Sequence, residues 1–252
     1  MLQALRHELP HENFLYVGDS ACAPYGDRAA GFVVERAITI TGFLVSQGAK
    51  AVVVGCNTAT AIAAASLRAR FAIPIVAIEP AVKPAASQTR SRVVGVLATT
   101  GTLSGANMAK LLASYGADVE FVIQPCTGLA DQVEKGELAS DRTRALVERY
   151  VRPIVEKGAD VVVLGCTHYP FLRDIIQQVA GPEVDVIDPA TAVARELRRR
   201  LDVAGLLNRD TDGGTERFWT TGSVEVVGPI VRQLWGANAE VAALKTDNPE
   251  DT

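Results

Sequence analysis

One phrase occurs twice in this chain and limits what the chain can fold into. Residues 48–58 read G-A-K-A-V-V-V-G-C-N-T, residues 158–168 read G-A-D-V-V-V-L-G-C-T-H, and the two align without a gap. In each copy a short β-branched run stops at a glycine and a cysteine, which is typical of a buried parallel strand followed by a turn. Ligands of open α/β sheets bind outside the carboxyl ends of such strands. The repeat therefore predicts two similar halves that each present a thiol, Cys56 and Cys166, where chemistry is usually placed.

Apolar runs and helical segments alternate along the whole chain. This alternation indicates an α/β fold with parallel sheets, and Gly48 and Gly158 are expected to end the helices that precede the two repeated strands. We expect two domains, the first formed by residues 1–80 plus 189–252 and the second by residues 81–188. The predicted strands are residues 13–18, 51–54, 75–78, 92–97, 119–125, 161–164, 184–187 and 218–221. The predicted helices are residues 2–9, 32–47, 59–71, 107–115, 142–157, 169–179, 191–201 and 224–235.

Composition excludes several classes of function. The 252 residues carry a net charge of −4 without a long basic stripe, so nucleic acid is not an expected partner. No apolar segment approaches the roughly 20 residues that a membrane-spanning helix needs, and no signal peptide is visible at Met1, so we expect a cytoplasmic protein without membrane contact. No Gly-rich dinucleotide fingerprint, P-loop or lysine in a pyridoxal-type setting is present, which favours chemistry without a cofactor.

Cysteine and histidine usage excludes two kinds of structural site. Four cysteines in a chain of this size do not make a disulfide framework, which indicates a reducing compartment. No CxxC pair is present and the chain has three histidines, so we expect no metal site. Cys22 and Cys126 lack the repeated context of the other two cysteines, and we interpret both as packing residues.

Several segments allow two interpretations from the residues alone. The polar loop at residues 19–28 is a connector or a substrate-contacting segment, and its spacing favours the connector. The hydroxyl-rich residues 98–105 bind a carboxylate, or they form a strand-to-helix turn with a capping threonine. His168, two positions after Cys166, makes a structural hydrogen bond or manages a proton.

The helix predicted directly after Cys56 also bears on the chemistry. Thr58 and Thr60 are positioned to cap its first turn. The positive end of the helix dipole would then point toward Cys56, which suits a carboxylate ligand or a thiolate.

Three motifs together resemble one family. They are G-C-N-T-A-T at residues 55–60, A-P-Y-G at residues 23–26 and G-C-T-H-Y-P at residues 165–170. In their order along the chain and in their spacing, the three motifs resemble the glutamate racemases of the cofactor-independent aspartate/glutamate racemase superfamily. The resemblance covers most of the chain. The resemblance implies two pseudo-symmetric domains, each a parallel sheet flanked by helices, with the active site in the cleft between them. It also implies an isomerase that interconverts L- and D-glutamate, with D-glutamate feeding peptidoglycan synthesis, cell-wall biogenesis and cell shape.

The resemblance also implies roles for individual residues. Cys56 and Cys166 match the two thiol bases, one for each face of the substrate. His168 and Glu134 match residues that assist the second thiol. Glutamate is the implied small-molecule partner, and a homodimer is left open as the assembly. The residues that match substrate contacts are Pro24, Tyr25, Gly26, Asn57, Thr58, Thr99, Thr102, Thr167 and His168.

One departure from the family pattern is large. Family members usually begin with a strand and a D-S-G-x-G-G-type turn before the helix in which Met1 lies, and their Asp and Ser serve the first thiol and the substrate. Asp19 and Ser20 belong to a later strand and do not replace them. We expect the chain as given to be less stable and less active than one extended by that strand. The alternative functions are another racemase of the superfamily, such as an aspartate racemase, or a catalytically impaired amino-acid-binding protein.

Overall fold

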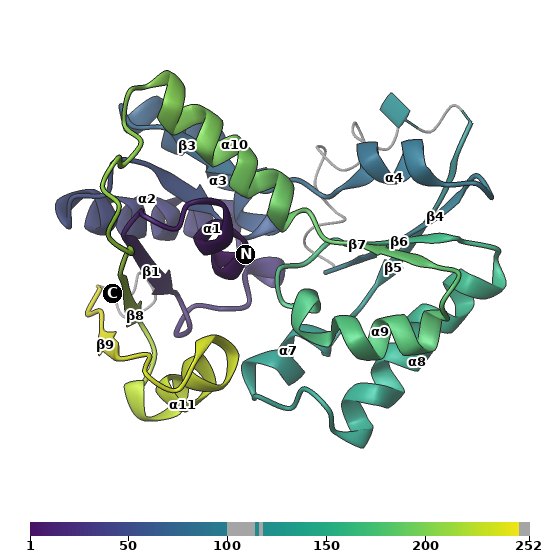
Figure 1. Cartoon of the computed structure of the whole chain (residues 1–252). Helices are drawn as coiled ribbons and strands as arrows, with labels where there is room; N and C mark the ends of the chain where they lie inside the picture. The colour runs from purple at the N-terminus through teal and green to yellow at the C-terminus, as the bar shows by residue number, and fades with distance from the viewer. Residues whose placement is uncertain (100–113, 116–117, 247–252) are drawn as a thin grey trace. The chain divides into compact units, whose positions relative to one another are not determined.

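The chain forms two compact α/β units in a computed structural model, which describes residues 1–99, 114–115 and 118–246 (Figure 1). Unit 1 comprises Met1–Gly55, Ile62–Ile78 and Ala190–Thr252, and unit 2 comprises Cys56–Ala61 and Glu79–Pro189. Every strand pairing in the described part of the chain is parallel, as strands alternating with helices predict. Most of the helix predicted at residues 107–115 lies outside the described residues.

Unit 2 is built on a four-stranded sheet with the order β5-β4-β6-β7. Helix α4 covers one face of this sheet, and α8 and α9 cover the other (Figure 1). The central strands β4 and β6 carry the chain to Ala98 and Leu164, so the residues that follow them lie at the same edge of the sheet. The elements are α4 (Val82–Gln88), β4 (Val93–Ala98), β5 (Glu120–Pro125), α7 (Leu129–Glu134), α8 (Asp141–Glu156), β6 (Val161–Leu164), η2 (Tyr169–Leu172), α9 (Arg173–Ala180) and β7 (Asp185–Ile187).

The alternation of side chains along β4 explains how both faces of this sheet are covered. Val94, Val96 and Ala98 are buried in the cluster that includes Val82 and Ala85 of α4. Gly95 faces the opposite way, where a Cβ atom would lie 2.2 Å from Ile154 Cγ2 of α8. A strand buried on both faces reads as a continuous apolar run, and a glycine in it marks a close approach of another element. Gly95 therefore lets α8 pack closely against the centre of the sheet.

Unit 1 contains two groups of strands that pair separately in the described residues, in the orders β1-β8-β9 and β2-β3. Leu5 of α1, Leu9 directly after it and Leu197 of α10 pack against β3. Leu67 of α3 packs with Val52 and Ile75. The elements are α1 (Leu2–Glu8), β1 (Phe14–Gly18), η1 (Tyr25–Asp27), α2 (Ala30–Ser46), β2 (Val52–Val54), α3 (Asn57–Arg70), β3 (Ile75–Ala77), α10 (Ala190–Val203), β8 (Glu216–Thr220), α11 (Val224–Trp235) and β9 (Val241–Ala243).

The glycines that open the two repeated phrases end helices, as the sequence predicts. Gly48 follows α2 with a φ of +88°, and Gly158 follows α8 with a φ of +87°. These values lie in the left-handed region that glycine adopts without steric conflict, which explains why a glycine precedes each repeated strand.

Some local predictions are wrong. The single helix expected at residues 169–179 is divided into η2 and α9, with Pro170 in the first turn of η2. Strand β9 and helix α4 were not predicted, because three residues of strand and a seven-residue helix containing Pro84 carry little periodic signal. None of the described helices combines the length and the apolar character that crossing a membrane requires.

Candidate active site

The second repeated cysteine lies at the carboxyl edge of the unit 2 sheet. Cys166 follows β6 after Gly165 and is 8% exposed. The N–H of Gly165 donates to the carbonyl of Leu97 at 2.7 Å, and a Cβ atom on Gly165 would lie 2.6 Å from that same carbonyl oxygen. Only glycine fits this approach of one backbone to another. The turn that carries Cys166 is thus fixed against the neighbouring strand β4.

Cys166 is the first member of a chain of three polar side chains. Its Sγ lies 3.5 Å from Nδ1 of His168, and Nε2 of His168 lies 2.6 Å from Oε1 of Glu134, the last residue of α7. The His168 side chain is 33% exposed and that of Glu134 is 49% exposed. A carboxylate that holds one ring nitrogen leaves the other directed at the sulfur, which is the arrangement of a nucleophile or base with an oriented imidazole.

The charges in this chain perturb one another. Burial alone would lower the pKa of His168, but its hydrogen bonds to Cys166 and Glu134 raise this pKa to about 10. The hydrogen bond from His168, against the opposing effect of burial, lowers the pKa of the Glu134 carboxyl. At neutral pH the pair is therefore an imidazolium and a carboxylate, and the imidazolium lies beside the Cys166 sulfur.

The first repeated cysteine has different neighbours. Helix α3 begins at Asn57, directly after Cys56, and the N–H of Ala59 points at Cys56 Sγ over 3.5 Å. Burial raises the pKa of the Cys56 thiol, the N–H of Ala59 opposes this shift, and negative charge on Cys166 raises the pKa further. The interaction with Cys166 therefore disfavours the state in which both sulfurs are thiolates.

A single buried amide links the two cysteine-bearing turns. Nδ2 of Asn57 donates to the carbonyl of Gly165 at 2.9 Å, across 108 residues of sequence. Asn57 is 5% exposed, and its Oδ1 has no hydrogen-bond partner among the described residues. A buried amide oxygen without a donor is uncommon in folded proteins and is a point at which a ligand N–H can be accepted.

Other predicted substrate contacts in unit 2 lie near these turns or outside the described residues. Thr58 is buried in the first turn of α3, Thr167 is partly exposed between Cys166 and His168, and Thr99 follows β4 directly. Thr102 lies outside the described residues. The prediction that Thr60 caps α3 is wrong, because this helix already begins at Asn57 and the Thr60 hydroxyl has no partner among the described residues.

The remaining predicted contacts lie in unit 1, in the loop after β1. Pro24 precedes the short helix η1, which contains Tyr25 and Gly26, and the Ala23–Pro24 peptide bond is cis. The hydroxyl of Tyr25 donates to Asp19 at the start of the loop. Asp19 in turn pairs with the buried Arg36 of α2. This loop is therefore braced by contacts of its own side chains and of α2.

Sequence reasoning missed Arg36 and Asp19 as organisers of this loop. Arg36 is 1% exposed, and its side chain lies in an otherwise largely apolar stretch of α2. Glu35 and Arg36 are the charged residues of this apolar helix. A cation in such a helix is the signal that could have revealed Arg36, since buried arginine is rare unless it is paired.

The two other cysteines are buried. Cys22 and Cys126 are each 2% exposed, and Cys126 Sγ donates to the carbonyl of Gln124 at 3.3 Å. Burial raises the pKa of Cys126 to about 12, so this thiol stays protonated at neutral pH. Among the described residues, no group of three or more His, Cys, Asp or Glu side chains is placed to hold a metal ion.

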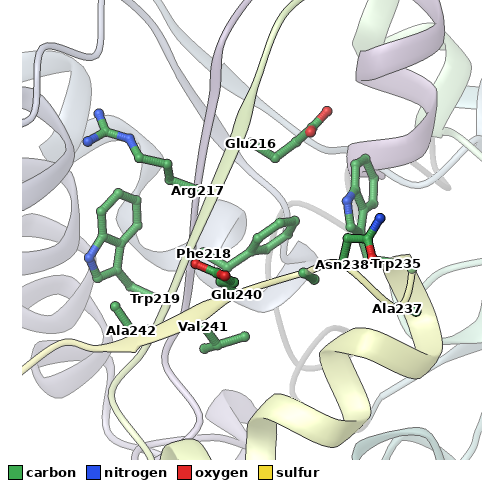
Figure 2. A pocket seen from close by; sticks show the side chains of 12 residues that line it. Glu216, Arg217, Phe218, Trp219, Trp235, Ala237, Asn238, Glu240, Val241 and Ala242 are labelled. Carbon is green, nitrogen blue, oxygen red and sulfur yellow. The ribbon is translucent and has the colours of Figure 1, made fainter.

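A pocket elsewhere in unit 1 contains none of the predicted site residues. It lies along β8, β9 and the end of α11, where the rings of Phe218 and Trp235 are 5.7 Å apart (Figure 2). Its lining includes no cysteine or histidine. We therefore identify the candidate site by its reactive side chains, because this pocket contains none of them.

Comparisons with known proteins show the family of this chain. The model of the Asp/Glu/Hydantoin racemase family matches residues 1–197. A glutamate racemase of Methylococcus capsulatus is 50% identical over 235 residues, which are 93% of this chain and 87% of that protein.

Two solved structures are similar over nearly the whole chain. Glutamate racemase isoform RacE1 of Bacillus anthracis has a TM-score of 0.87 at 30% identity, covering 97% of this chain and 92% of that one. The glutamate racemase of Escherichia coli, solved with L-glutamate and the activator UDP-MurNAc-Ala, has a TM-score of 0.84 at 27% identity, covering 97% of this chain and 94% of that one. The family match over most of the chain, together with 50% identity to one curated relative, decides the assignment. This chain belongs to the Asp/Glu/Hydantoin racemase family.

Proposed function

We propose that this chain interconverts L-glutamate and D-glutamate by a two-base proton transfer. Membership of the family makes it an amino-acid racemase, and the glutamate racemases among its relatives favour glutamate over other amino acids. The observation that carries the proposal is the link between Asn57 and Gly165, which holds together two turns that each bear a cysteine. Racemisation needs one base on each face of the substrate, and this arrangement supplies two.

In the proposed reaction one thiolate removes the α-proton and the opposite thiol delivers a proton to the other face. The Cα–H bond breaks toward one sulfur, an S–H bond forms there, and the proton of the second thiol moves to Cα. The site ends with one thiol and one thiolate, as it began. The electrostatic coupling between Cys56 and Cys166 supports this role, because it disfavours the doubly ionised form that could not return a proton.

His168 and Glu134 assist the second thiol in this proposal. The imidazolium, 3.5 Å from Cys166 Sγ, offers that sulfur a positive charge and a hydrogen bond. Glu134 keeps the imidazole protonated and oriented. The developing negative charge on the substrate requires donors around its carboxylate, and backbone N–H groups and hydroxyls suit this purpose. We assign contact with the substrate, through these donors and through neighbouring backbone, to Pro24, Tyr25, Gly26, Asn57, Thr58, Thr99, Thr102, Thr167 and His168.

We further propose that the D-glutamate formed serves peptidoglycan synthesis in the cytoplasm. The structure of the E. coli relative contains UDP-MurNAc-Ala as its activator, and that compound carries a muramic-acid sugar. The resemblance of the motifs to glutamate racemases supports the same use here.

The test is turnover of the purified chain, followed by the loss of circular dichroism with L-glutamate or D-glutamate as the starting compound. We expect racemisation in both directions and α-proton exchange in D2O, with much slower turnover of L-aspartate. Faster turnover of aspartate would identify a different racemase of the superfamily. Binding of glutamate without exchange of its α-proton would identify an amino-acid-binding protein and overturn the proposed reaction.

A further inference from the structure

A buried network in unit 1 fixes the loop that follows β1. Arg36 reaches from α2 to Asp19 with two parallel hydrogen bonds, Nε to Oδ2 at 3.0 Å and Nη2 to Oδ1 at 2.7 Å. The side chains of Arg36 and Asp19 are 1% and 7% exposed. Bidentate pairing of this kind fixes geometry as well as charge, because the planar guanidinium matches both carboxylate oxygens.

Asp19 also holds two hydroxyl groups from different segments. Its Oδ2 accepts the hydroxyl of Tyr25, and its Oδ1 accepts the hydroxyl of Thr221 at 2.8 Å. Each carboxylate oxygen thus receives one arginine N–H and one hydroxyl, so the buried charge is compensated. These contacts, with the opposing effect of burial, lower the pKa of the Asp19 carboxyl and keep it ionised at neutral pH.

The network connects the loop to three other segments of unit 1. Thr221 follows β8, and its hydroxyl also accepts the N–H of Ala21 at 3.2 Å. Nη2 of Arg36 donates to the hydroxyl of Thr246 at 2.9 Å, beyond β9. The loop is therefore held at Asp19, at Ala21 and at Tyr25, with Arg36 supplying the compensating charge.

The bond between Tyr25 and Asp19 has a consequence for what this loop can offer a ligand. The Tyr25 hydroxyl donates its hydrogen to the buried Asp19 carboxylate and therefore points into the protein. The backbone of residues 24–26 is what remains to contact a ligand at the carboxyl end of β1, where ligands of parallel sheets bind. The conformation of that backbone depends on where Asp19 holds the tyrosine ring.

We propose that Arg36 is a positioning residue for glutamate: it holds Asp19, and through Asp19 the Tyr25 hydroxyl, so that the backbone of residues 24–26 meets the substrate in one conformation. The proposal rests on the proposed function, in which this loop contacts glutamate. Arg36 acts at a distance, and its loss weakens binding of both enantiomers without changing the thiol chemistry.

The experiment compares Arg36→Lys and Tyr25→Phe with the control Arg6→Lys. Arg36→Lys keeps the charge and loses the bidentate geometry, while Tyr25→Phe removes the one hydroxyl that ties the loop to Asp19. Arg6 pairs with Glu216 and with three backbone carbonyls near the amino ends of β1 and β8. The control therefore disrupts a similar arginine network at the opposite end of the same strand pair.

We expect KM to rise in Arg36→Lys and in Tyr25→Phe by roughly 2- to 12-fold, the equivalent of one net hydrogen bond, with kcat nearly unchanged. The rise should be the same for L-glutamate and D-glutamate. Arg6→Lys should keep the wild-type KM even if its melting temperature falls. Because Arg36 and Tyr25 act through the same carboxylate, the double variant should show a smaller rise than the product of the two single rises.

Two results would overturn the proposal. One is a wild-type KM in both Tyr25→Phe and Arg36→Lys, which would make the network a purely structural brace. The other is multiplication of the two effects in the double variant, which would show that Arg36 does not act through Tyr25. If Arg36→Lys does not fold, Tyr25→Phe alone decides by its KM. A wild-type chain that does not racemise glutamate would contradict the proposed function instead, so the two failures are distinguishable.

Discussion

The two repeated cysteines have similar sequences around them and different partners. Cys166 has the imidazole of His168 at 3.5 Å, whereas Cys56 has the backbone N–H of Ala59 at the same distance. An imidazolium carries a full charge and a backbone N–H a partial one, so the two sulfurs lie in different electrostatic surroundings. The proposed reaction is symmetric in its result, but its two bases are tuned by different means.

Removing either thiol should abolish racemisation. We expect Cys56→Ala and Cys166→Ala each to lower turnover in both directions by at least ~10²–10⁴-fold, the usual effect of losing an acid–base group. Circular dichroism assays in both directions measure this. Cys22→Ala and Cys126→Ala are the matched controls, because these buried cysteines lack the repeated context, and they should keep near wild-type rates. Near wild-type turnover of Cys56→Ala or Cys166→Ala would contradict the two-base reaction.

The ion pair between His168 and Glu134 predicts a pH-dependent contribution to stability. The folded pKa of His168 is raised from 6.5 to about 10, so its contribution is complete below pH 6.5 and is lost as the pH rises toward 10. The folded pKa of Glu134 is lowered from 4.5, so its contribution is present above pH 4.5 and is lost as the pH falls below that value. The pair therefore stabilises the fold most between pH 4.5 and pH 6.5.

Glu134→Gln should accordingly lower the melting temperature most between pH 4.5 and 6.5, and the difference from wild type should shrink by pH 10. The effect is small, because 49% of the Glu134 side chain is exposed and water screens the pair. NMR titration of the His168 ring should show a lower pKa in the variant. Glu137→Gln, at a nearby exposed glutamate, is the control. An unchanged His168 titration in Glu134→Gln would refute the assignment.

At the level of secondary structure, the two copies of the repeated phrase diverge after the cysteine. The first copy enters helix α3 at once, at Asn57. The second forms a turn and the short helix η2, which places Thr167 and His168 outside regular structure beside Cys166. In this turn the two ring nitrogens of His168 contact Cys166 and Glu134. A helix that continued from Cys166 would direct the His168 side chain differently. The functional difference between the copies thus comes from how each strand ends.

Gly165→Ala tests the close approach that fixes the second turn. The added Cβ would lie 2.6 Å from the Leu97 carbonyl oxygen, a backbone atom that cannot move without disturbing β4. We expect a loss of about 1–3 kcal/mol in the free energy of unfolding and a fall in activity, because Cys166 shifts with the strand end. Urea denaturation and the racemisation assay measure the two effects.

Gly42→Ala is the control for this change. Gly42 lies within α2, and a Cβ atom there would meet nothing within 4 Å. Alanine in place of this helical glycine should stabilise the chain by about 0.5–1 kcal/mol and leave activity unchanged. If Gly165→Ala behaved like Gly42→Ala, the approach of Gly165 to Leu97 would have no role in fixing the site.

At the level of the whole chain, unit 2 includes a segment from far away in the sequence. Residues Cys56–Ala61, which include the start of α3, group with Glu79–Pro189, although the strand before them and the rest of α3 belong to unit 1. The hydrogen bond from Asn57 to Gly165 belongs to this grouping. A ligand that contacts Asn57 is therefore expected to stabilise unit 2 as it binds.

Glutamate should raise the melting temperature of the protein. A ligand at 100 times its Kd stabilises the folded state by ~2.7 kcal/mol, which corresponds to a shift of roughly 5–10 °C for a chain of this size. Thermal denaturation with L-glutamate, D-glutamate or L-aspartate measures this. Both enantiomers of glutamate should give the shift at similar concentrations, and L-aspartate, shorter by one methylene, should give a smaller one. An equal shift with aspartate would contradict the proposed specificity.

Local patterns in the sequence were enough to predict most of the elements. The β-branched runs before Gly55 and Gly165 predicted β2 and β6, and the glycines at 48 and 158 predicted the helix ends, because these features depend on neighbouring residues alone. The repeat also directed attention to Cys56 and Cys166, whose chemistry depends on the thiol itself. The parallel α/β class follows from the same alternation of strands and helices.

The tertiary structure alone decided which residues meet. The bond from Asn57 to Gly165 joins residues 108 positions apart, and Glu134 reaches His168 across 34 positions. The pairing of Arg36 with Asp19 was not predicted, because a charge on a helix is usually solvated and only the packing of α2 buries this one. Local propensity acts over a few residues, whereas burial and charge compensation depend on the whole fold. The strands and the thiols were therefore predictable from the sequence, whereas the contacts and the burial of their partners were decided by the tertiary structure.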